Sequence, residues 1–220
     1  RVFKSILPCT EDELKFLEEF YVAFRGRYMP LLIESARHVE SIKRVRHSLK
    51  AGKVAPYLEK IFHFFNVAEK QAQIDVLFLW WPPIQRTNAA AAGSFMLMKF
   101  NSILHGDRDD SEIIIHELIH SIAERQSDEQ KQSLTRSFYN DCPEAERNVK
   151  YYEVLDEPLA VVLGQMLYLK LHEPHKFLSE SRSNDWRRGA WNNLFAKLLH
   201  PISEEIIKKK KKITDGFVPA

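Results

Sequence analysis

Residues 113–122 read IIIHELIHSI, and this stretch restricts the fold more than any other. His116 and His120 are four positions apart, so on a helix their imidazoles point the same way and can share one metal ion. Glu117 lies beside the same site, where its carboxylate can take a proton from a metal-activated water. Apart from Glu117 and the two histidines, residues 114–122 are uncharged and mostly apolar, as a buried helix requires. The segment therefore predicts a metal-binding helix with Glu117 as general base.

A hydrolytic zinc site needs a third protein ligand and an open position for water. A histidine six residues after His120 does not supply this ligand, because Gln126 stands there. A glutamate from a later helix remains, and residues 151–160, YYEVLDEPLA, offer Glu153 and Glu157.

These two segments resemble the gluzincin group of zinc metallopeptidases, in which a His-Glu-x-x-His helix precedes a ligand glutamate on a downstream helix. The run DEPLA at residues 156–160 is similar to that downstream segment, with Pro158 in place of the common glycine. The resemblance implies Glu157 as the third ligand. Glu153 is the alternative, because Glu153 and Glu157 have the spacing of a ligand and its supporting acid in thermolysin-like members. Asp156 is interpreted as a helix-start acid that interacts with the helix dipole.

The activity implied by the resemblance is zinc-dependent hydrolysis of a peptide or protein substrate, with one Zn²⁺ per chain. In gluzincins the strand before the metal helix lies at the edge of the cleft and pairs with extended substrate, and residues 94–101 occupy that place here. A plain buried strand is the alternative for residues 94–101. Candidates for stabilising the oxyanion follow from residue type alone, and they are Tyr151, Tyr152, His172 and His175. No Gly-x-Met-x-Asn stretch supports exopeptidase activity.

The composition agrees with one helix-rich domain. The chain has 220 residues, of which 45% are hydrophobic and only 7 are glycine, so it can bury a core and is not a turn-rich all-β protein. The net charge of +2 gives no general electrostatic reason to expect nucleic acid as a partner. No apolar run approaches the ~20 residues of a membrane span. The oligomeric state does not follow from the sequence.

Three further features leave alternatives open. Cys9 and Cys142 can form one disulfide or stay apart, and they do not make a Cys-type zinc site. The first residue is Arg1 and not Met, which favours a periplasmic or secreted protein after removal of a leader, with trimming of the chain as the alternative. The five lysines at 208–212 are interpreted as a solvated helix end, with binding of phosphates or acidic lipid as the alternative.

We expect an α+β fold: a mostly helical, zincin-like domain with a small antiparallel or mixed sheet before the metal-binding helix. The single domain spans residues 1–220, with N-terminal helices in 1–72, the sheet and metal helix in 73–126, and C-terminal helices in 127–220 that carry the third ligand. Capping boxes are expected at residues 10–13 and 127–130. The expected helices are 10–26, one from Pro30 onward, 56–65, 111–125, one opened by the second capping box, 143–155, 158–171, 185–199 and 203–212. The expected strands are a buried one at 74–81 and a second at 94–101, with a loop at 88–93 between them and a turn at 105–107.

Two other classes of protein compete with the peptidase. Residues 117–120 also form a Glu-x-x-His unit of a di-iron carboxylate bundle, but a second such unit is absent from the sequence. A zincin-like fold can also serve as a catalytically silent binding protein, because fold does not determine function. The intact Glu117 argues against a silent site.

Overall fold

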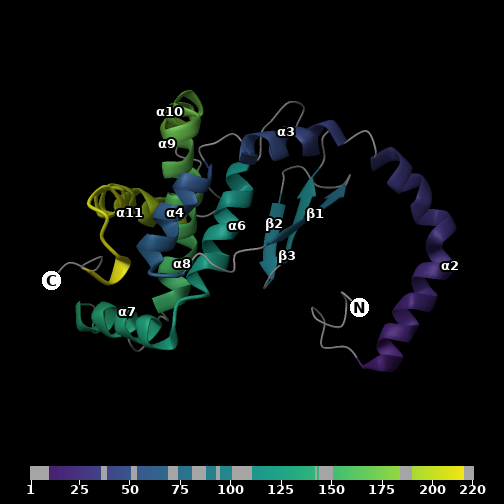
Figure 1. Cartoon of the computed structure of the whole chain (residues 1–220), viewed down its shortest axis with the longest axis horizontal. Coiled ribbons are helices and arrows are strands. Elements are labelled where there is room, and N and C mark those ends of the chain that lie inside the picture. Colours follow the sequence, from purple (N-terminus) through teal and green to yellow (C-terminus); the bar gives the residue numbers. More distant parts are fainter. Residues whose placement is uncertain are drawn as a thin grey trace.

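The structure is a computed structural model that describes residues 10–35, 39–50, 54–68, 74–80, 88–92, 95–100, 111–141, 143, 151–183 and 190–215 (Figure 1). The N-terminal helices are α2 (Glu11–Ser35), α3 (Val39–Lys50) and α4 (Val54–Phe65). The strands β1 (Asp75–Trp80), β2 (Asn88–Ala92) and β3 (Phe95–Phe100) precede helix α6 (Ser111–Ala123). The remaining elements are α7 (Asp128–Asp141), α8 (Tyr151–Val161), the π-helical turn η4 (Val162–Leu167), α9 (Tyr168–His172), α10 (Pro174–Ser183), α11 (Ala190–Lys208) and the 3-10 turn η5 (Ile213–Asp215). The expected mostly helical α+β class with a small mixed sheet is confirmed.

The sheet has the strand order β1-β3-β2, with β1 parallel and β2 antiparallel to β3. Strand β3 is therefore the central strand and not an edge. The segment 88–93, expected as a loop, contains strand β2, because pairing with β3 compensates for the low strand propensity of its alanines.

One face of the sheet is buried and the other is open. Met96 and Met98 of β3 pack against Ile114 of α6 and Val45 of α3. On the opposite face Leu77, Leu79 and Leu97 are exposed. The expectation of a buried strand at 74–81 was wrong, because the described helices cover only one face of this sheet.

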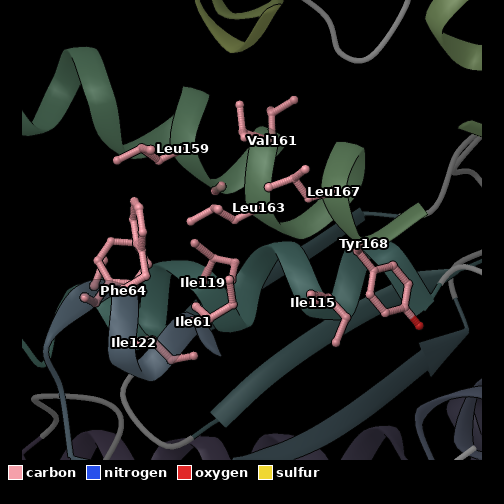
Figure 2. Packing of buried hydrophobic residues seen from close by; sticks show 14 of the residues in the cluster. Ile61, Phe64, Ile115, Ile119, Ile122, Leu159, Val161, Leu163, Leu167 and Tyr168 are labelled. Carbon is pink, nitrogen blue, oxygen red and sulfur yellow. The ribbon is translucent and has the colours of Figure 1, made fainter. Parts of the chain in front are cut away.

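The main core lies between α4, α6, the helix formed by α8, η4 and α9, and α11 (Figure 2). Fully buried members include Ile61 and Phe64 of α4, Ile119 of α6, Leu163 of η4 and Leu169 of α9. This packing holds α6 against α8 and η4, which is the arrangement that matters for the site.

Several expected helix ends were wrong for one reason. Helix α2 continues through Gly26 and Pro30, α8 continues through Pro158 into η4 and α9, and α11 continues through Pro201. A proline removes one hydrogen bond and a glycine lowers helix propensity, yet neither forbids a helix when its flanks are good helix formers or are packed in a core. The expected boundaries at Gly26, Leu155 and Leu199 are therefore interior positions of longer helices.

Both expected capping boxes are confirmed. The Glu13 carboxylate accepts a hydrogen bond from the Thr10 amide at 2.7 Å, and Gln130 Oε1 accepts one from the Ser127 amide at 2.9 Å. In the lysine run, Lys208 pairs with Glu204 at 2.9 Å, and Lys210 adopts a positive φ of 51° where α11 ends. Residues 208–211 are exposed, as expected for a solvated helix end, but α11 ends at Lys208, so the expectation of a helix to 212 was wrong.

None of the described helices is long and apolar enough to span a membrane. Cys9, Cys142 and the expected turn at 105–107 lie outside the described residues.

Candidate metal centre

His116 and His120 both lie on helix α6. Isoleucines at positions 114, 115 and 119 are buried on its sides, so the helix packs between the sheet and the α8–η4 helix. His116 is fully buried, while His120, one turn later, keeps 19% of its side chain exposed. The pair therefore lies at the point where a buried helix reaches solvent.

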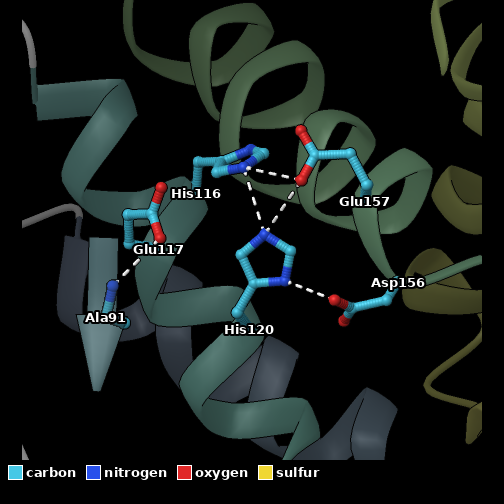
Figure 3. A network of polar contacts seen from close by, with 6 residues as sticks. All are labelled: Ala91, His116, Glu117, His120, Asp156 and Glu157. Carbon is cyan, nitrogen blue, oxygen red and sulfur yellow. Dashed lines mark hydrogen bonds and ion pairs between the residues drawn. The ribbon is translucent and has the colours of Figure 1, made fainter. Parts of the chain in front are cut away.

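Three ligand-type atoms converge at this point (Figure 3). His116 Nε2 and His120 Nε2 are 3.2 Å apart, and Glu157 Oε2 lies 3.6 Å from the first and 3.3 Å from the second. Ligand atoms roughly 2.0–2.1 Å from a tetrahedral ion are about 3.3–3.4 Å from one another. The three atoms thus have the spacing of one face of a tetrahedral site.

Asp156 determines which nitrogen of His120 faces the site. Its Oδ2 accepts a hydrogen bond from His120 Nδ1 at 2.8 Å, so Nδ1 keeps its proton and Nε2, which faces Glu157, is the nitrogen that would bind a metal ion. The interpretation of Asp156 as a helix-start acid was wrong, because α8 begins earlier, at Tyr151.

The electrostatics of His120 show that the site attracts positive charge. Burial alone lowers the pKa of His120, but hydrogen bonds and charges from Asp156 and Glu157 outweigh burial and raise this pKa to about 10. Two carboxylates against one imidazole favour a cation, which is either a proton on the ring or a metal ion beside it.

Glu117 lies on the side of α6 that faces the sheet. Its Oε2 accepts a hydrogen bond from the Ala91 amide of β2 at 3.3 Å, and the side chain is only 8% exposed (Figure 3). One carboxylate oxygen is thereby held by the edge strand β2. This contact depends on β2, which sequence reasoning interpreted as a loop.

The remaining candidates have different outcomes. Of the oxyanion candidates, His172 packs against the rings of Tyr57 and Tyr168, and His175 is exposed. The side chains of Tyr151, Tyr152 and Glu153 lie outside the described part of the structure. Among the described side chains, Glu157 is the acid that lies close to both histidines. This position of Glu157 favours it over Glu153 as the third ligand.

Asp156 and Ala91 are the two residues of the centre that sequence reasoning missed. The position of Asp156 directly before the expected ligand was the available signal for the first. The alanine run had no local signal for the second.

No protein-family model, curated protein or solved structure matches this chain. The resemblance to gluzincins therefore stays a prediction from the sequence.

Proposed function

We propose that this protein is a zinc-dependent peptidase whose metal is held by His116, His120 and Glu157. The observation that supports the proposal most directly is the 3.2–3.6 Å spacing of the three ligand atoms, which fits one face of a tetrahedral ion. Two imidazoles and one carboxylate are the donor set that suits zinc, whereas Ca²⁺ and Mg²⁺ prefer oxygen donors.

A single ion per chain is proposed. Among the described residues, the group formed by His116, His120 and Glu157 is the one metal-ligating cluster. A di-iron centre uses four carboxylates and two histidines. The described cluster holds one carboxylate, which favours the mononuclear proposal.

Glu117 acts as the general base. A zinc ion held by His116, His120 and Glu157 would polarise a carbonyl and would lower the pKa of water at the site towards ~7. The Glu117 carboxylate takes the proton from water and passes it to the leaving amine. The hydrogen bond from Ala91 holds one of its oxygens beside strand β2.

Strand β2, and not residues 94–101, is the proposed place for extended substrate. The role expected for residues 94–101 is excluded because β3 already pairs on both sides, with β1 and with β2. Strand β2 ends the sheet on the side of Glu117, and Ala91 directs its amide toward that side. A peptide aligned along this edge would bring its backbone to the general base.

The test compares His116→Ala and Glu117→Gln with the unchanged protein. Metal content is measured first, and chelator-sensitive cleavage of a mixed peptide library second. We expect one zinc per chain in the unchanged protein and in Glu117→Gln, and loss of zinc in His116→Ala. Cleavage should fall by at least ~100-fold in Glu117→Gln, because a general base contributes 10²–10⁴-fold.

The results separate the peptidase from the other two classes. Unchanged cleavage by Glu117→Gln contradicts the mechanism. Bound zinc without any chelator-sensitive cleavage favours the silent binding protein. Two irons per chain favour the di-iron protein.

A further inference from the structure

The helix that carries Glu157 approaches α6 most closely at a glycine. Glu157 and Ala160 are three residues apart on α8, so they share one face, and from this face Glu157 reaches His116. Ala160 is fully buried there. A Cβ atom placed on Gly164 would lie 2.3 Å from His116 Cα and 2.6 Å from His116 N. Gly164 therefore lies against the backbone of the histidine that points into the candidate centre.

Any larger residue at position 164 changes the distance between the two helices. The clashing atoms are two backbone atoms of α6 and the His116 Cβ, none of which moves when a side chain rotates, so no rotamer change relieves the contact. Restoring an ordinary carbon–carbon contact of about 3.5 Å requires a separation of about 1 Å. A metal site tolerates errors of only about 0.2 Å in its ligand distances.

The backbone around Gly164 is not an ordinary α-helix. Residues Val162–Leu167 form the π-helical turn η4, which changes the register between Glu157 and the helix that follows. Such turns are frequent at functional sites. This one comes directly after the segment that supplies Glu157 and contacts the segment that supplies His116.

Two buried tyrosines hold the turn in place. The Tyr57 hydroxyl, from α4, donates a hydrogen bond to the Leu163 carbonyl next to Gly164. The Tyr168 hydroxyl lies 3.1 Å from Ser111 Oγ at the start of α6. The turn is thus tied to α4 on one side of Gly164 and to α6 on the other, which resists any outward shift.

We propose that Gly164, held against His116 by the π-helical turn and Tyr57, is a positioning residue that sets the approach of Glu157 to the two histidines. Its missing side chain lets α6 and η4 come close enough for the three ligand atoms to share one ion. This role rests on the metal-binding part of the proposed function and does not depend on peptidase activity.

The test is the metal affinity of Gly164→Ala, measured by competition with a chromophoric chelator on the full chain. We expect Zn²⁺ affinity to fall by about 100-fold, the upper end of what displacing the support of a ligand costs. Gly26→Ala is the matched control: the same substitution, also inside a helix, at a position with no atom within 4 Å of the added Cβ. It should bind Zn²⁺ within twofold of the unchanged protein.

A purely structural role is separated by two further measurements. Ile206→Ala creates a cavity in the core beside α11. It should lower Tm while leaving Zn²⁺ affinity within threefold of that of the unchanged protein. The visible spectrum of bound Co²⁺ should change in Gly164→Ala and stay unchanged in Ile206→Ala. Unchanged Zn²⁺ affinity and an unchanged Co²⁺ spectrum in folded Gly164→Ala overturn the proposal.

If Gly164→Ala does not fold, the Zn²⁺ affinity of Tyr57→Phe tests the proposal instead. This variant keeps the ring and removes only the hydrogen bond to Leu163, so affinity should fall by at least threefold, and unchanged affinity overturns the proposal. An unchanged protein that binds no Zn²⁺ overturns the metal site and this role together. If the unchanged protein binds Zn²⁺ but cleaves no peptide, the proposed peptidase activity is contradicted. The role of Gly164 in metal binding is still tested by the affinity of Gly164→Ala.

Discussion

Replacing Asp156 with alanine removes the hydrogen bond that its carboxylate accepts from His120 Nδ1 and leaves all three ligand atoms in place. The donor and acceptor are 2.8 Å apart, as in a charge-assisted bond. Such bonds contribute about 1.5–3 kcal/mol, but the Asp156 side chain is 36% exposed and water screens it. Screening places the contribution just below this range, at about 1.4 kcal/mol, which corresponds to an approximately tenfold loss of Zn²⁺ affinity.

The variant Asp156→Asn separates the hydrogen bond from the charge. The asparagine Oδ1 still accepts from Nδ1 and keeps His120 in the same tautomer, so only the charge contribution is lost. We expect a loss of about threefold, intermediate between the unchanged protein and Asp156→Ala.

Both variants are measured by chelator competition at fixed pH and salt, with Glu59→Ala as control. Glu59 is an exposed acid on α4, so its removal changes the net charge equally without touching the site. Zn²⁺ affinity within twofold of the unchanged protein in Asp156→Ala would refute the reasoning. So would a larger loss in Asp156→Asn than in Asp156→Ala.

Three further predictions test the electrostatics and the packing. Because the pKa of metal-free His120 is raised to about 10, its ring is charged at pH 8, and Zn²⁺ binding should release a proton. Titration calorimetry in buffers of different ionisation enthalpy measures the proton release. A binding heat that does not depend on the buffer contradicts the prediction. The hydrogen bond from Lys170 lowers the pKa of Glu204, so the pair stabilises the fold above the ordinary pKa of 4.5, and this stabilisation is lost as pH falls through the lowered pKa. The variant Glu204→Gln should therefore be about 1 kcal/mol less stable than the unchanged protein at pH 7 and equally stable at low pH. Urea unfolding measures both free energies. On α9, Leu169→Ala should cost about 2–5 kcal/mol of unfolding free energy and exposed Leu171→Ala less than about 0.5 kcal/mol, and equal losses would contradict the described core.

The expected elements that agree with the structure depend on neighbours in the chain. The capping boxes at Thr10 and Ser127 involve atoms three residues apart, and the helix around His116 follows from its own apolar pattern. Several expectations that failed concern helix interruptions at Gly26, Pro30, Pro158 and Pro201, and the loop expected where strand β2 lies. Local propensity opposes the structure at each of these positions. In α8 and α11, burial in the core outweighs the unfavourable local propensity. In β2, pairing with β3 outweighs it.

The sequence alone determined that His116 and His120 face the same way, because an α-helix returns to the same side after four residues. It also indicated Glu157 and Glu153 as the acids that could join them, without a geometric reason to choose. The tertiary structure brings Glu157 Oε2 to both histidines, makes Asp156 a partner of His120, and places β2 against Glu117. These contacts join segments that are far apart in the chain. The contacts of Asp156 and Glu157 with the histidines depend on how closely α8 and η4 pack on α6, which the absence of a side chain at Gly164 permits and no local pattern encodes.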